Sequence, residues 1–227
     1  MSGSFQVFSL EHVLTLFIIL IFSLLIFFLR TRFNLIRYSL GFLLFGSEAA
    51  EQIWKFAAGE WSVSEDLPLH LSDLAVLLSI IMLFTSSRLL FAFLWYAGLA
   101  SSFQAIATPD LGTYSFPHLI FFLFFLSHGG VIIACLMFVF QGYKPGLQSL
   151  WITAAVITLY GAAVYGLNQL LGSNYLYLMK KPEGNSLLEF LGAWPWYLYN
   201  MEAVMLVSFF LLYLPFSKRS RPSVDFR

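Results

Sequence analysis

Charged side chains are scarce in this sequence. Asp, Glu, Lys and Arg make up 11% of its 227 residues, whereas a soluble domain contains about 25%. Hydrophobic residues account for 59% and include 26 phenylalanines, and the mean hydropathy is +0.81. A soluble core of this size cannot bury so much apolar surface, so the composition excludes a soluble enzyme, a nucleic-acid-binding protein and a disordered regulator. It predicts an integral membrane protein whose partners are membrane lipids.

Cysteine is nearly absent as well. Cys135 is the only one in the sequence, so no disulfide can form within the chain and no cysteine-rich metal site is possible. The apolar neighbours of Cys135 indicate a small core residue. We expect no cofactor and, in the favoured interpretation, no metal ion.

Long apolar runs are plentiful and continuous. A bilayer core requires about 20 apolar residues of helix, and the alternation typical of a membrane β-barrel is missing from the pattern. The sequence therefore predicts one all-α membrane domain over residues 1–227, a bundle of seven transmembrane helices. The predicted spans are residues 10–29, 35–56, 67–84, 89–107, 116–140, 147–171 and 196–216.

Positive charge is unevenly distributed between the predicted loops. If the N-terminus lies outside, nine Lys and Arg residues fall on the cytoplasmic side, and three, Lys55, Lys180 and Lys181, fall outside. Cytoplasmic loops are typically the richer in Lys and Arg, so the N-terminus is predicted to be outside and the C-terminus inside. The short basic tail 217–227 is then cytoplasmic. The connection 172–195, rich in Tyr and Trp, is predicted to lie at the outer interface.

Polar residues inside the predicted spans gather in the half that this topology places outside. Ionisable groups at membrane depth are costly and mark candidate functional sites, so the pattern predicts a polar cavity open to the outer leaflet. Hydrogen bonding between helices without any chemistry is the alternative. The residues concerned include Glu48, Glu51, Gln52, Lys55, His70, Ser72, Asp73, Ser101, Gln104, Thr108, His128, Asn168, Asn200 and Glu202.

Ser72 and His128 form the most reactive combination in this set. A serine becomes a nucleophile when a base such as histidine lies within hydrogen-bond reach. At the rise of an α-helix, Ser72 lies about 8 Å below Leu67 and His128 about 16 Å below Pro117. The spacing alone therefore leaves a packing role for Ser72 open. A carboxylate often orients such a histidine, and the candidates are Glu48, Glu51, Asp73 and Glu202.

Other histidines allow two further interpretations. His70 and Asp73, three residues apart, share a helix face and are the start of a possible zinc site. His128 and either Glu48 or Glu51 would complete it, although the spacing of zinc hydrolases is missing. We expect His118, after Pro117, to be an interfacial or capping residue, and His12 to be solvated.

Six short segments stand out: LPLHLSDLA at 67–75, QAIATPD at 104–110, FPH at 116–118, SHGG at 127–130, GSNYLYL at 172–178 and LGAWPWY at 191–197. Together they resemble the YwaF-type bacterial integral membrane proteins, a family of largely unassigned function, over residues 35–200. That family is distantly similar to animal transmembrane protein 164, a membrane acyltransferase that remodels ether phospholipids. It is also similar to the androgen-induced protein one group of intramembrane hydrolases of fatty-acid esters.

The resemblance implies a nucleophile at Ser72 and a histidine base at His128, in a multi-pass protein of the bacterial cytoplasmic membrane. Many relatives have Cys where Ser72 stands. The favoured hypothesis is a lipid acyl hydrolase or acyltransferase in which Asp73 or Glu51 orients His128. The alternatives are a non-enzymatic lipid or small-molecule binding or transport protein and a metal-dependent hydrolase. Gln104 or Asn168 would bind the oxyanion, and the further substrate-binding candidates are Glu48, His70, Asn174, Trp194 and Glu202.

Overall fold

A computed structural model describes residues 5–182 and 187–217. Within those ranges the secondary structure is entirely helical, with seven α-helices, which confirms the predicted all-α class. The α-helices are α1 (Leu10–Phe28), α2 (Phe33–Ala58), α3 (Leu71–Thr85), α4 (Arg88–Ala107), α5 (Leu119–Phe140), α6 (Leu147–Leu171) and α7 (Trp196–Tyr213). Short 3-10 turns follow or connect them: η1 (Arg30–Arg32), η2 (Tyr175–Tyr177), η3 (Leu187–Leu191) and η4 (Leu214–Phe216).

Five of these helices are long and apolar enough to cross a membrane: α1, α4, α5, α6 and α7, the last together with η4. α3 has only 15 residues, and α2, with 26 residues, carries several charged side chains in its second half. The chain is therefore a multi-pass membrane protein. Seven crossings and the orientation stay predictions.

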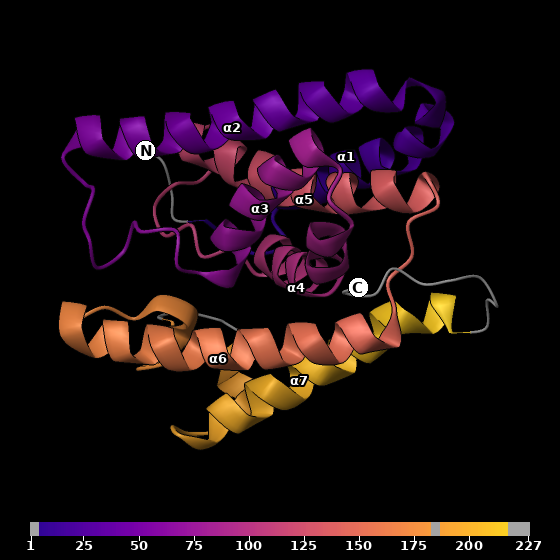
Figure 1. The fold of residues 1–227 in the computed structure, drawn as a ribbon. Helices are drawn as coiled ribbons and strands as arrows, with labels where there is room; N and C mark the ends of the chain where they lie inside the picture. Colours follow the sequence, from indigo (N-terminus) through magenta and orange to yellow (C-terminus); the bar gives the residue numbers. More distant parts are fainter. Residues whose placement is uncertain (1–4, 183–186, 218–227) are drawn as a thin grey trace.

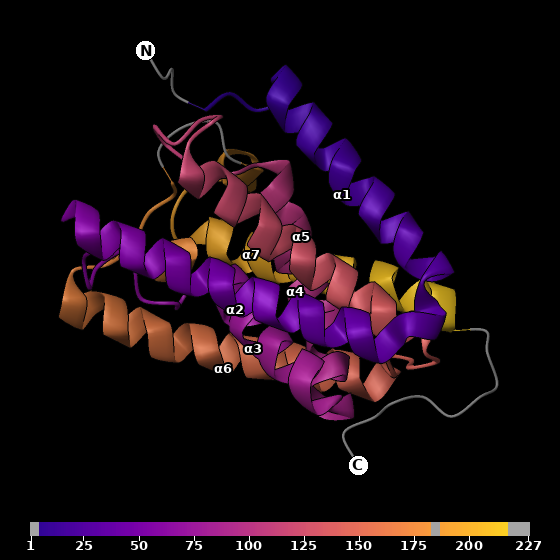
Figure 2. The ribbon, with the colours of Figure 1, turned by 90° about the horizontal axis from the view of Figure 1, so that it is seen from above.

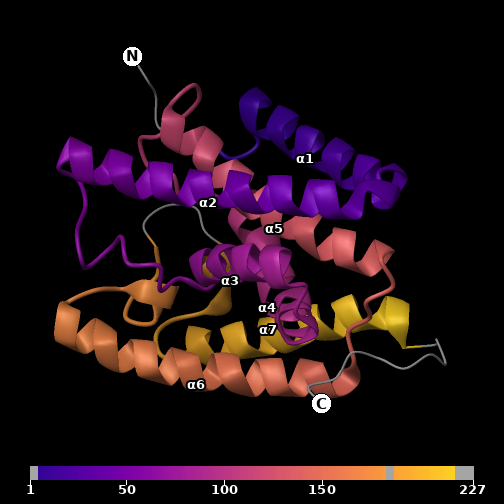
Figure 3. The same ribbon diagram turned by 45° about the horizontal axis from the view of Figure 1, so that its top comes forward.

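The helices form three layers (Figure 1). The middle layer consists of α3, α4 and α5, which pack on one another; α2 covers α3 and α5, and α1 packs on α5. On the opposite side α6 and α7 pair with each other and contact the middle layer through α4. The same separation is visible when the molecule is tilted (Figure 3), and from above α1 is inclined to α2 (Figure 2). Helix α5 is consequently the most buried of the five candidate spans.

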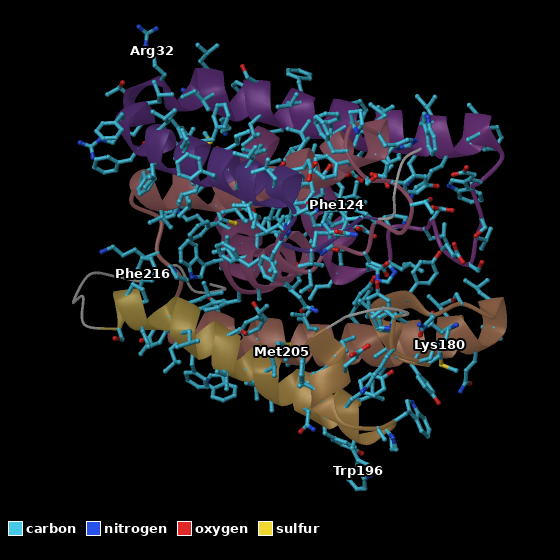
Figure 4. All side chains as sticks on the ribbon, turned by 180° about the vertical axis from the view of Figure 1, so that it is seen from behind. Arg32, Phe124, Lys180, Trp196, Met205 and Phe216 are labelled. Atoms are coloured by element: carbon cyan, nitrogen blue, oxygen red, sulfur yellow. The ribbon has the colours of Figure 1, made fainter. Side chains whose placement is uncertain are left out.

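The bundle has two distinct ends. Arg32 and Phe216 lie toward one end, and Lys180 and Trp196 lie toward the other (Figure 4). We call these the Arg32 end and the Lys180 end; the charge distribution in the sequence predicts that the first is cytoplasmic and the second outside. Oxygen and nitrogen atoms are concentrated between the layers toward the Lys180 end (Figure 4). The predicted cytoplasmic tail lies, from residue 218 onward, outside the described residues.

Two helices begin later than the apolar pattern predicts. α3 starts at residue 71 and not 67, and α5 at 119 and not 116. In both cases a proline, Pro68 or Pro117, follows the predicted first residue, and the residue before a proline disfavours the helical conformation. His70 and His118 therefore occupy the N-cap positions of α3 and α5.

Small residues allow α5 to approach its neighbours closely. A Cβ atom at Gly130 would lie 2.4 Å from Leu44 Cδ2 on α2, and one at Gly98 would lie 3.2 Å from Val131 Cγ1. Cys135 is completely buried next to α4, which confirms the predicted core position. The side chains of α2, α4 and α5 are thus brought into direct contact along the middle of the bundle.

Candidate functional site

A polar cluster joins α2 to α5 in the middle of the bundle. Ser47 Oγ and Ser127 Oγ lie 3.0 Å apart, and Ser127 Oγ donates to Glu48 Oε1 at 2.9 Å. Ser47 is 4% exposed and Ser127 is 2% exposed. Sequence analysis selected Glu48 but missed both serines. The signal was available: each serine is adjacent in sequence to a selected residue, Glu48 or His128.

An ion-pair chain extends from this cluster along α2 toward the Lys180 end. Lys55 Nζ lies 2.9 Å from Glu51 Oε1 and 2.9 Å from Asp66 Oδ1. Asp66 Oδ2 in turn accepts from the backbone N–H of Ser62 at 2.7 Å. Glu51 and Lys55 are four residues apart on one face of α2, and Asp66 is an additional partner from the loop that follows α2. One cation between two carboxylates fixes this loop against the helix.

His128 lies next to the cluster and is 5% exposed. Its Nδ1 lies 2.8 Å from the carbonyl oxygen of Phe124, one helical turn earlier. A carbonyl oxygen can only accept, so Nδ1 carries the hydrogen and Nε2 of the neutral ring has a free lone pair. The Phe124 ring stacks on the imidazole with centroids 4.3 Å apart. Nε2 is buried and has no hydrogen-bond partner.

Ser72 and Asp73 lie on the first turn of α3, which packs against α5. Ser72 Oγ donates to Asp73 Oδ1 at a long 3.4 Å. Since Nε2 of His128 is unpartnered, Ser72 is not hydrogen-bonded to it in this structure. Glu48 and Glu51 lie on α2, which packs against both α3 and α5. Three helices therefore bring these charged groups into one neighbourhood.

The zinc interpretation finds no ligand set in the described part of the chain. No group of three or more His, Cys, Asp and Glu side chains comes together there in an arrangement that suits a metal ion. His70 is directed elsewhere: its Nδ1 accepts from the backbone N–H of Leu176 at 3.3 Å. Its ring packs against Tyr175 and Tyr177.

His12, in the first turn of α1, and His118, at the N-cap of α5, both make structural hydrogen bonds. His12 is completely buried, so the expectation that it is solvated is wrong. Its Nδ1 accepts from Phe8 N–H at 3.0 Å, and its Nε2 lies 2.7 Å from the carbonyl oxygen of Ile106 on α4. His118 caps α5, because its Nδ1 accepts from Ile120 N–H at 3.2 Å. The predicted capping role of His118 is confirmed.

The segment 172–178, which we call the clasp, connects the loops at the Lys180 end. The Tyr175 hydroxyl donates to Val63 O at 2.7 Å and accepts from Leu67 N–H at 3.0 Å. Burial raises the pKa of this hydroxyl. Both sides of the Asn168 amide bind the clasp: Oδ1 accepts from Tyr175 N–H at 2.9 Å and Nδ2 donates to Tyr175 O at 2.8 Å. Asn168 thus holds the clasp, and its amide is not available for an oxyanion.

Tyrosine–carboxylate contacts also connect these loops. Tyr177 donates to Asp110 Oδ2 at 2.9 Å, and burial, followed by the charge of Asp110, raises the pKa of its hydroxyl. Tyr114 donates to Glu60, and this hydrogen bond raises the pKa of Tyr114 to about 12. Both phenols therefore stay protonated and act as donors at neutral pH.

The remaining candidates lie apart from the Glu48–Ser127–His128 region. Asn174 Oδ1 accepts from the N–H groups of residues 179 and 180, so it organises a turn. Trp194 is 54% exposed and donates to a carbonyl in the clasp. Gln104 is exposed near the end of α4. Glu202 accepts from Thr158 Oγ1 at 3.2 Å and so joins α7 to α6.

Comparison with known proteins identifies one family. The model of the TMEM164 family matches residues 7–213, nearly the whole chain. No curated protein matches this sequence, and no solved structure matches it.

Proposed function

The chain belongs to the TMEM164 family, and from this we propose that it is an intramembrane lipid acyl hydrolase or acyltransferase. The activity is the one that the sequence resemblance implies. His128 carries the proposal, because its fixed tautomer leaves a buried, unshared lone pair on Nε2. A neutral histidine with a free nitrogen in a water-poor interior is suited to accept a proton from a hydroxyl group.

The proposed nucleophile is Ser72. Its Oγ attacks the acyl carbonyl of a lipid ester while His128 Nε2 takes its proton. The bond from the acyl carbon to the alcohol oxygen then breaks, and the leaving alcohol receives the proton from Nε2. Ser72 Oγ now contacts Asp73 weakly at 3.4 Å, so its rotation toward α5 breaks only a long hydrogen bond. Catalytic hydrogen bonds of this kind often form only when substrate is bound.

Neighbouring residues support the charge changes in this mechanism. The Phe124 carbonyl orients the ring through Nδ1, in the position that a carboxylate occupies in many serine hydrolases. Glu51, on the helix α2 that packs against α5, would stabilise the imidazolium that forms. We further propose that the substrate is a membrane lipid entering from the outer leaflet of the bacterial cytoplasmic membrane, with Trp194 at the interface.

A serine-reactive lipid analogue tests the proposal. An alkyl fluorophosphonate added to the purified protein should label Ser72, and Ser72→Ala should abolish the labelling. Ser208→Ala is the matched control, because Ser208 is a membrane-helix serine whose Oγ donates to Val204 O on the exposed side of α7. Unchanged labelling of a folded Ser72→Ala protein would overturn the nucleophile. Saturable lipid binding without any labelling would favour the non-enzymatic alternative.

A further inference from the structure

Three unpartnered polar atoms lie in the middle layer of the bundle. Among the described residues, five buried side-chain polar atoms have no hydrogen-bond partner, and three of these belong to α3, α4 and α5: Ser79 Oγ, Ser102 Oγ and His128 Nε2. Ser79 and Ser102 are completely buried. Buried polar groups in proteins are normally hydrogen-bonded, so an unpartnered one calls for an explanation, such as a bound water or a catalytic role.

The packing of α4 against α5 brings Ser102 to the level of His128. Cys135 Sγ lies 3.6 Å from the carbonyl oxygen of Leu94, and the Cα of Gly98 faces Val131. Residue 94 is thus opposite residue 135, and residue 98 is opposite residue 131. Because α4 and α5 are antiparallel, one further helical turn places residue 102 opposite residues 127 and 128.

The faces agree with this register. Ser102 lies four residues after Gly98 and therefore on the same face of α4, and His128 lies three residues before Val131 on the same face of α5. The two unpartnered atoms thus belong to the two facing sides of one helix contact.

We propose that Ser102 and His128 bind the hydroxyl group of the acyl acceptor between α4 and α5. Nε2 can only accept from a bound group, whereas the Ser102 hydroxyl can donate to it. A hydroxyl satisfies both, because its O–H donates to Nε2 and its oxygen accepts from Ser102 Oγ. The acceptor is therefore water or a lipid alcohol. This inference rests on the proposed function and assigns its second step.

The second step balances without any further reactant. The acceptor oxygen attacks the carbonyl carbon of acyl-Ser72 while its proton moves to Nε2. The bond between the acyl carbon and Ser72 Oγ breaks, and Ser72 Oγ recovers the proton from Nε2. Nothing is oxidised or reduced. Ser102 acts as a positioning residue for the acceptor. A 4-nitrophenolate leaving group departs without needing a proton, so with such an ester the first step does not depend on Ser102.

Intact-mass kinetics of the purified protein with a 4-nitrophenyl fatty-acid ester separate the two steps. Ser102→Ala should leave the rate of acyl-Ser72 formation within twofold and slow its loss about 100-fold, the effect of removing one positioned donor, so the acyl adduct accumulates. Thr153→Val and Ser101→Ala are the controls. Thr153 is a buried, unpartnered hydroxyl on α6, and Ser101 adjoins Ser102 but donates within its own helix to Gly98 O. Both controls should lose the adduct at the wild-type rate.

The outcomes distinguish the two proposals. A Ser102→Ala protein that forms and loses the adduct at wild-type rates overturns the acceptor site while the proposed function stands. A wild-type protein that forms no adduct at Ser72 overturns both. If Ser102→Ala fails to fold, as judged by gel filtration, Ser102→Gly repeats the measurement with a smaller side chain. Added glycerol provides a second readout: it should shift the products of the wild type from fatty acid to ester, and Ser102→Ala should slow the formation of this ester about as much as it slows the loss of the adduct in water.

Discussion

The Lys180 end of the bundle and the middle of α5 both contain poorly exposed histidines, but the rings have different partners. At the Lys180 end, His12 has both ring nitrogens engaged, and His70 and His118 each accept from a backbone N–H. In the middle of α5, His128 is engaged through Nδ1 alone. Burial by itself therefore does not identify a functional histidine. The direction of the hydrogen bond at Nδ1 separates these rings. Nδ1 of His70 and of His118 accepts, which uses the lone pair of the neutral ring, whereas Nδ1 of His128 donates and leaves the Nε2 lone pair free to take a proton.

The largest effect expected from this comparison is the loss of turnover at His128. His128→Ala and His128→Gln should each lower ester turnover about 100- to 10,000-fold, because neither side chain can take a proton from Ser72. The double variant with Ser72→Ala should be no worse than the single variants, since nucleophile and base act as one unit. Turnover of a fluorogenic lipid ester by protein in detergent measures both. An active His128→Gln protein would contradict the assignment of the base.

His12→Ala should show the reverse pattern. It removes a buried ring with two hydrogen bonds and contacts to Phe5 and Phe125, so we expect a loss of about 2–4 kcal/mol in the free energy of unfolding. Turnover per folded molecule should stay within twofold. Chemical unfolding in detergent, followed by tryptophan fluorescence, checks the first and active-site titration the second. A stable but inactive His12→Ala protein would contradict the assignment of His12 to fold stability and not to turnover.

The smallest effect is expected at His118. His118→Ala removes the side-chain acceptor from the N-terminus of α5, and losing such a cap costs about 1 kcal/mol. His118→Asn, which can restore the cap, should recover most of that stability. Turnover of both variants should equal that of the wild type in the same lipid-ester assay. A large activity loss in His118→Ala that His118→Asn does not repair would place His118 in the site.

The local features of the fold were predictable from sequence. Continuous apolar runs locate the helices, and the four-residue spacing of Glu51 and Lys55 brings them together whatever the rest of the chain does. The late starts of α3 and α5 depend on single prolines inside apolar runs. Their effect on the preceding residue is local, so it too was open to prediction.

The contacts that define the candidate site were not predictable in this way. Ser47 and Ser127 are 80 residues apart, and His12 and Ile106 are 94 apart. Their pairing depends on how far one helix is shifted along another, which is set by side-chain packing over whole faces. Periodicity gives the face of a helix but not this shift, so it selected Glu48 and His128 and missed the serines between them.

The contact between Gly130 and Leu44 constrains how the sequence around this site can change during evolution. Leu44 is completely buried, and its Cδ2 would lie 2.4 Å from a Cβ atom at position 130, so a larger residue at 130 requires Leu44 to move or to be replaced by a smaller residue. Ser47 and Glu48 lie within about one turn of Leu44, where they meet Ser127. Selection that preserves the polar cluster therefore also acts on the side-chain volumes at positions 44 and 130, although neither position contacts the substrate in the proposed mechanism. Across relatives, positions 44 and 130 should change as a pair, and a lineage that lost the glycine would have to rebuild the polar cluster with it.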